Sequence, residues 1–109
     1  MALLISHKQG ATFSYADLLA IPAGNWTGKS QVRRANTAHA LLADGVVTIG
    51  ALNVNNLRPI LVTIYAQSTQ AWPLEDVEWD VRFTNNSTPP QVIMTETVNI
   101  TVQRAVTAP

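Results

Sequence analysis

The chain has 109 residues, seven Lys or Arg, seven Asp or Glu, a formal net charge of zero and no cysteine. This length predicts one domain over residues 1–109, and the lack of cysteine excludes a disulfide framework, a thiolate metal site and a cysteine nucleophile. Charged residues make up 13% of the chain, against about 25% in typical domains. Such a surface has no basic footprint for nucleic acid. Because a net charge near zero promotes association, we expect a homo-oligomer or a part of a larger assembly.

Turn-forming residues recur about every ten positions, and they separate short runs rich in Val, Ile, Thr and aromatic residues. This spacing is typical of an all-β fold. After an N-terminal segment, 1–9, the first strand is predicted at 11–19 and the second at 26–35. The third and fourth strands, 39–43 and 46–51, are expected to be joined through Asp44-Gly45, a dipeptide that favours a hairpin turn.

The fifth predicted strand, 59–66, is almost continuously apolar, which is typical of a central strand covered on both faces or of an interface strand. A short helical turn is expected at 68–72, because Pro73 must end it. The sixth strand, 77–84, alternates large apolar with polar side chains, and a long last strand, 91–104, precedes a tail at 105–109. Together these elements predict a single antiparallel β-sandwich of about seven strands, immunoglobulin-like, with one short helical turn.

No apolar run approaches the ~18 residues of a membrane span, so we expect no membrane partner. The two histidines, His7 and His39, are far apart in the sequence. The chain has neither a Gly-x-Ser-x-Gly elbow nor a Gly-rich phosphate-binding motif. We therefore expect no catalytic residues, no cofactor and no metal, and hence no enzyme.

A cluster of acidic residues precedes and enters the sixth strand: Glu75, Asp76, Glu78 and Asp80. Glu78 and Asp80 lie on one face of that strand with their Cα atoms about 6.6 Å apart, at ~3.3 Å per residue, so the two carboxylates are close enough to share a cation. No loop of the kind that binds calcium follows them. We interpret the cluster as a solvated strand face whose charges discourage aggregation.

Glu96 interrupts the apolar face of the last strand. A carboxylate at such a position must be paired, protonated or released outward by a bulge. Arg33, Arg34 and Arg82 are the candidate partners for an ion pair. The functional alternative is a catalytic acid with a raised pKa.

Trp72 precedes a proline at the end of the expected helical turn. A tryptophan at this place either plugs the open end of the sandwich or anchors a partner, because tryptophan is enriched at interface hot spots. We favour the plug but keep Trp72 among the candidate interface residues. These are the side chains of the fifth strand and its surroundings: Ile60, Val62, Ile64, Tyr65 and Trp72.

Four stretches, in this order, resemble small β-sandwich domains encoded in phage and prophage tail clusters, of the type found at the N-terminus of baseplate upper proteins. The resemblance spans residues 9–107 and rests on order and spacing. The stretches are GATFSY at 10–15, WTGKSQVR at 26–33, STQAWP at 68–73 with VEWDV at 77–81, and ETVNITV at 96–102 with Val106-Thr107. The segment IPAGN at 21–25 departs from the pattern, because those domains have a different turn there.

The resemblance implies a non-enzymatic structural component of a phage tail or baseplate, in the virion or in the bacterial cytoplasm during assembly, with other tail proteins as partners. It offers no catalytic residues. Arg33 and Glu96 both fall on matched positions, so we expect them to form a structural ion pair. The alternative function is a carbohydrate- or ligand-binding β-sandwich for host recognition, which exposed aromatic side chains on one face would favour. Trp26, Trp72 and Tyr65 are the residues concerned.

Overall fold

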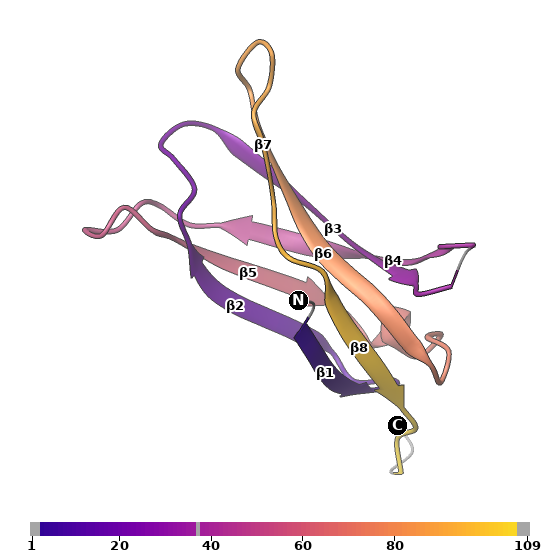
Figure 1. Ribbon diagram of the computed structural model, residues 1–109. Coiled ribbons are helices and arrows are strands. Elements are labelled where there is room, and N and C mark those ends of the chain that lie inside the picture. The colour runs from indigo at the N-terminus through magenta and orange to yellow at the C-terminus, as the bar shows by residue number, and fades with distance from the viewer. Residues whose placement is uncertain (1–2, 37, 107–109) are drawn as a thin grey trace.

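The computed structural model describes residues 3–36 and 38–106 (Figure 1). The ends of the expected N-terminal segment and tail, residues 1–2 and 107–109, lie outside the described residues, as does Thr37. The described part of the chain forms eight strands and one short helix. They are β1 (Leu3–Lys8), β2 (Phe13–Leu19), β3 (Trp26–Arg34), β4 (Leu41–Ile49), β5 (Arg58–Ile64), α1 (Ala66–Thr69), β6 (Asp76–Asn85), β7 (Val92–Met94) and β8 (Val98–Gln103).

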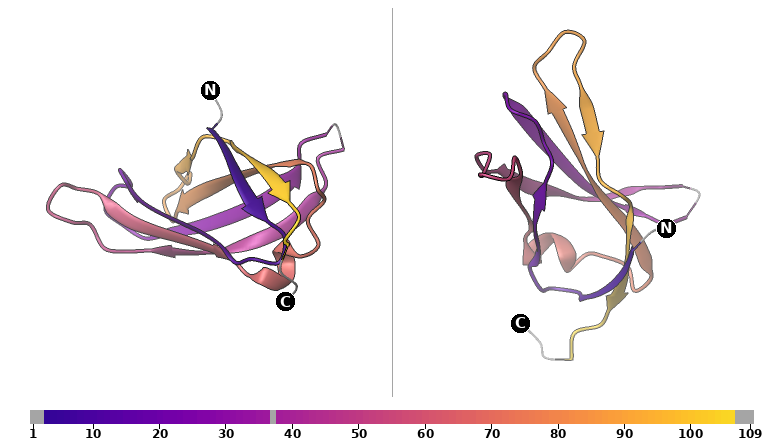
Figure 2. Two further views of the ribbon diagram at one scale, coloured as in Figure 1. Left: turned by 90° about the horizontal axis from the view of Figure 1, so that it is seen from below. Right: turned by 60° about the vertical axis from the view of Figure 1, so that its left-hand side comes forward.

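All eight strands belong to one curled sheet, so the prediction of an all-β fold with a short helical turn is confirmed. The strand order is β1-β8-β6-β3-β4-β5-β2, and β7 pairs with β6 beside β8. Every pairing is antiparallel except that of β1 with β8, which is parallel. The sheet folds over into two facing layers and comes close to a barrel, with β1 and β2 as its two edges (Figure 2).

Strand β4 joins the two layers. Its first half, up to Gly45, pairs with β3, and its second half, from Val46, pairs with β5. The predicted hairpin turn at Asp44-Gly45 is therefore wrong, because these residues lie inside one continuous strand. Gly45 is needed for close packing where the strand crosses between layers. A Cβ there would lie 3.1 Å from the Cβ of Ser30 and 3.1 Å from Cγ1 of Val62.

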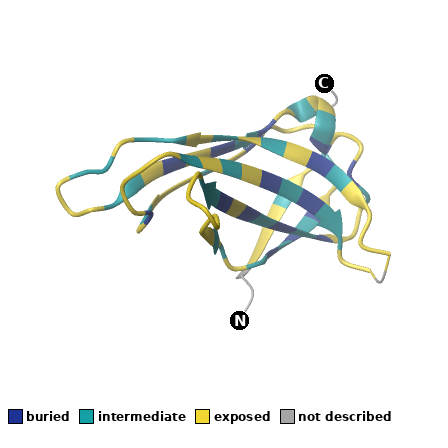
Figure 3. Ribbon diagram, turned by 90° about the horizontal axis from the view of Figure 1, so that it is seen from above, coloured by how far each residue is buried: buried dark blue, intermediate teal, exposed yellow. Residues whose placement is uncertain are grey.

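The core lies between the two layers, where alternate residues of each strand point inward. Figure 3 shows this alternation as bands of buried and exposed residues along the strands. Strand β6 follows the predicted pattern, because its apolar residues are buried and its polar residues face outward. The largest fully buried side chains are Trp72, Phe83, Ile21, Ile64, Ile100, Val32, Val62, Val77 and Val81.

Two strands differ from the prediction. Strand β1 was not expected, because none of its described side chains belongs to the buried core, and its pairing with β8 is a backbone interaction that periodicity does not reveal. The long last strand is divided into β7 and β8, which both pair with β6. The pairing changes from Arg82 with Met94 to Trp79 with Val98, a shift of one residue that indicates a bulge around Glu96.

Candidate functional site

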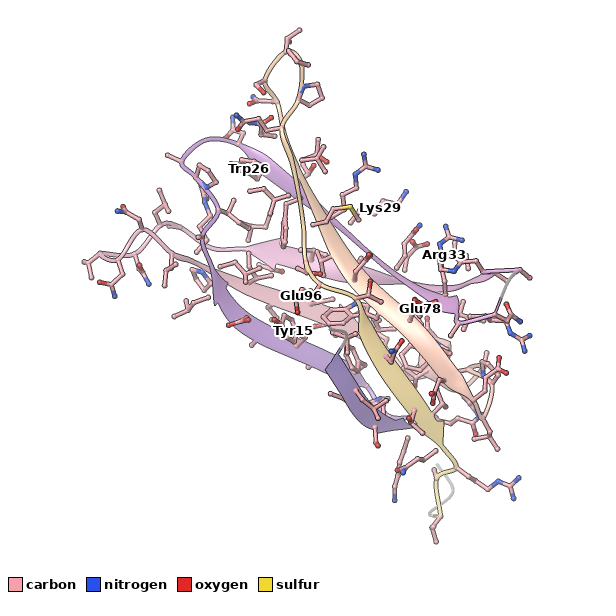
Figure 4. The ribbon with its side chains drawn as sticks, viewed as in Figure 1. Tyr15, Trp26, Lys29, Arg33, Glu78 and Glu96 are labelled. Carbon is pink, nitrogen blue, oxygen red and sulfur yellow. The ribbon has the colours of Figure 1, made fainter. Side chains whose placement is uncertain are left out.

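The outer face of the β3–β6 layer carries a group of charged side chains of both signs. Cross-strand neighbours on this face are Lys29 with Arg82, and Arg33 with Glu78. Figure 4 shows Lys29, Arg33 and Glu78 on this side of the molecule. They line a shallow groove of about 280 Å³. The full lining is Lys29, Gln31, Arg33, His39, Glu78, Trp79, Asp80, Arg82, Met94 and Thr97. We call this surface the charged face.

The predicted ion pair between Arg33 and Glu96 is wrong. The guanidinium of Arg33 donates instead to the backbone oxygen of His39 and to Oε1 of Gln31, both at 3.1 Å. Met94 and Thr97 both line the charged face although they are three residues apart, so the alternation of side chains is broken around Glu96. Glu96 is exposed on the segment that joins β7 to β8 (Figure 4). A bulge, rather than a partner, accommodates this charge.

The residues of the acidic cluster contact different partners. Glu75 accepts from Arg34, with 2.7 Å between its Oε1 and Nη2 of Arg34, and Asp76 accepts a hydrogen bond of 2.8 Å from the hydroxyl of Thr101. Oε1 of Glu78 lies 3.8 Å from Nδ1 of His39. Among the described residues, no three acidic, histidine or cysteine side chains are grouped so that they could hold a metal ion. The interpretation as a solvated face fits these separate contacts.

Four of the five candidate interface residues are core residues. Ile60, Val62, Ile64 and Trp72 are each 2% exposed or less, so the prediction that they meet a partner is wrong. The near-continuous apolar sequence of β5 conceals an ordinary alternation, with every second side chain buried. Tyr65, directly after β5, is exposed.

The outward side chains of β2, β5 and the second half of β4 form a surface without charge, which we call the uncharged face. Leu18, Val46 and Leu61 are each about half exposed there. A shallow hollow of about 640 Å³ runs over part of this surface, with Asp17 at its rim. The outward residues are Ser14, Ala16, Leu18, Val46, Thr48, Pro59, Leu61 and Thr63. The sequence predicted an uncharged contact surface on β5. The side chains predicted to form it were Ile60, Val62 and Ile64, however, and these point inward.

Tyr15 and Asp17 lie on the inner side of β2, at the edge of the sheet. The hydroxyl of Tyr15 donates to Oδ2 of Asp17 at 2.6 Å, and its ring packs edge-on against Trp79 at 4.9 Å between centroids. Burial, with the hydrogen bond to the Asp17 carboxylate and its charge, raises the pKa of Tyr15 to about 12. The same hydrogen bond, with one from the backbone N–H of Leu18, lowers the pKa of Asp17. Together these contacts hold the Asp17 carboxylate against its own strand.

The three aromatic residues considered for ligand binding lie in different places. Trp72 is buried and packs against His7 and Phe13, which confirms the interpretation as a plug. Trp26 is partly buried and packs against the core (Figure 4), whereas Tyr65 points to solvent. They do not form a common platform on one face.

No protein-family model matches the chain, and no curated protein matches its sequence. In the described part of the chain, no helix has the length and apolar character needed to cross a membrane.

Proposed function

We propose that this chain is a non-enzymatic structural component of a bacteriophage or prophage tail or baseplate, located in the virion, and that it acts through protein–protein contacts. The observation that carries the proposal is the division between its two outer faces. One face bears Lys, Arg, Asp and Glu side chains, whereas the outward residues of the other are all uncharged and only Asp17 lies at its rim. An apolar surface without charge is the kind of surface that a partner protein covers. The resemblance of its motif order to that of phage tail domains supports this kind of assembly.

The size of this surface indicates what the contact needs. Full burial of a leucine or valine contributes about 1.5–3 kcal/mol. Leu18, Val46 and Leu61 are already about half buried, so covering all three contributes roughly 3 kcal/mol. Micromolar affinity requires about 8 kcal/mol. The uncharged face therefore needs further interactions, such as backbone hydrogen bonds at a neighbouring sheet edge.

The test compares two lysine substitutions at residues of equal exposure. Leu61 lies on the uncharged face and Val92 lies on the other outer face, and each is 44% exposed. The purified chain is tested pairwise against the proteins encoded beside it. We expect at least one to bind, with Leu61→Lys weakening binding about 10-fold or more, because an unpaired charge at a buried contact costs at least ~1.4 kcal/mol. Val92→Lys is expected to bind like the unmodified chain.

Two results would contradict the proposal. The first is that none of the neighbouring proteins binds. The second is that Leu61→Lys and Val92→Lys weaken binding equally, which would place the contact elsewhere. Circular dichroism of both variants controls for loss of folding.

A further inference from the structure

Strand β2 presents an unpaired edge of the sheet. All seven of its residues pair with β5 in one regular register, from Phe13 with Ile64 to Leu19 with Arg58. On its other side β2 pairs with none of the described strands. Such an edge offers a row of backbone donors and acceptors to another strand.

Two contacts identify which residues present their backbone to this edge. The carbonyl of Pro59 accepts from the backbone N–H of Gly50 at 2.8 Å, so the polar groups of Pro59 point toward β4. Leu18, opposite Pro59, is therefore not hydrogen-bonded to β5. Its N–H instead donates to Oδ1 of Asp17 at 2.8 Å. Since backbone direction alternates along a strand, Ser14, Ala16 and Leu18 all face the free edge.

The edge of β2 has little protection against pairing. Natural edge strands are protected by charged side chains, proline or bulges, and β2 has no lysine, no proline and no bulge. Its one charged side chain, Asp17, is held by the hydroxyl of Tyr15. The other edge strand, β1, ends in an exposed lysine, Lys8.

We propose that the free edge of β2 pairs with β2 of a second copy of this chain, antiparallel and symmetric about Ala16. In this register Ala16 faces Ala16 of the second copy on the uncharged face, and Asp17 faces Tyr15 of the second copy. No like charges lie directly opposite each other, because each Asp17 carboxylate faces a neutral phenol of the second copy.

The overall charge is compatible with this partner, because the chain has a formal net charge of zero and two copies do not repel each other at a distance. The two uncharged faces become continuous across the joined sheets. The inference deepens the proposed function and rests on it, because a dimer joined at β2 offers a partner protein two uncharged faces in one surface.

The test uses the absence of cysteine from the chain. In the proposed register the Cα atoms of Ala16 in the two copies are about 5.5 Å apart, which is within the range that a disulfide spans. Ala16→Cys is therefore expected to form a disulfide-linked dimer rapidly under mild oxidation. Thr48→Cys, exposed on the same face but away from the edge, is the matched control and is expected to cross-link at least 10-fold more slowly.

A second measurement uses the unlinked protein. Sedimentation equilibrium of the full chain is expected to show a dimer, and Ala16→Pro is expected to raise its dissociation constant about 10-fold or more, because proline removes an N–H from the free edge. Ala16→Ser, which keeps the N–H, is the control. Circular dichroism shows whether the proline variant folds. If it does not fold, the cross-linking experiment still tests the inference.

The inference is overturned if the chain is monomeric at all concentrations, or if Thr48→Cys cross-links as fast as Ala16→Cys. A monomer that still binds a neighbouring tail protein through Leu61 would overturn this inference and leave the proposed function standing. A dimer that binds no such protein would support this inference and contradict the proposed function.

Discussion

Replacing Ser30 by alanine removes one buried hydrogen bond between the neighbouring strands β3 and β6. Nε1 of Trp79 donates to Oγ of Ser30 at 2.6 Å, and the two residues are 2% and 1% exposed. The indole of Trp79 also packs edge-on against Phe13 and Tyr15 of β2, at 5.3 and 4.9 Å between centroids. This hydrogen bond therefore orients the ring that supports the edge strand.

The expected cost follows from the burial of the donor. After Ser30→Ala, Nε1 of Trp79 has no acceptor and no access to water, and an unsatisfied buried donor costs about 1–3 kcal/mol. At roughly 4 °C per kcal/mol for a domain of this size, the melting temperature is expected to fall by about 4–12 °C. Ser14→Ala, the same change at an exposed position of β2, is expected to lie within about 0.5 kcal/mol of the unmodified chain.

Urea denaturation of Ser30→Ala, Trp79→Phe and the double variant measures the coupling directly. Phenylalanine lacks the N–H, so the cycle separates the hydrogen bond from the loss of packing. We expect a coupling energy of about 1–3 kcal/mol between the two positions. A coupling near zero, or a Ser30→Ala variant as stable as Ser14→Ala, would refute the reasoning.

Three further predictions concern stability. Arg58 donates to the carbonyls of Ile21, Pro22, Gly24 and Gly50 at 3.0–3.3 Å. In urea denaturation, Arg58→Ala is expected to lower the free energy of unfolding by about 1–3 kcal/mol. Arg58→Lys is expected to recover little of this, because an ammonium group cannot reproduce the planar fork of the guanidinium. A Cβ at Gly28 would overlap Cγ1 and Cβ of Val47. Gly28→Ala is therefore expected to cost about 1–3 kcal/mol of stability in thermal denaturation. Adding Val47→Ala is expected to restore part of this stability, and a double variant as unstable as Gly28→Ala would contradict the overlap. Tyr15→Phe is expected to cost about 0.5–1.5 kcal/mol at pH 7. Since folding raises the pKa of Tyr15 from 10.0 to about 12, its contribution is complete below pH 10 and is lost as the pH rises through 12, so the difference in stability between the two proteins is expected to shrink in that window.

Local sequence patterns predicted the elements whose side chains alternate regularly. The strand at 77–84 and the helical turn near Trp72 were both found from a few neighbouring residues. The split of the last strand at Glu96 was signalled by a carboxylate in an apolar register, although the residue that accommodates it was wrongly expected to be Arg33. The error arose because a carboxylate in an apolar register is compatible with either an ion pair or a bulge, and only the pairing of β6 with β7 and β8 shows the bulge.

The sequence by itself determined that the chain is all-β, which strands alternate, and that much of its surface has no charge, because these properties follow from side-chain type and a period of two residues. Only the tertiary structure decided that Asp44-Gly45 continues β4 between the layers, that Ile60, Val62 and Ile64 point inward, and that β2 is a free edge. These features depend on which strands meet in space. Pairing between distant segments is a property of the whole sheet, so no local window contains it.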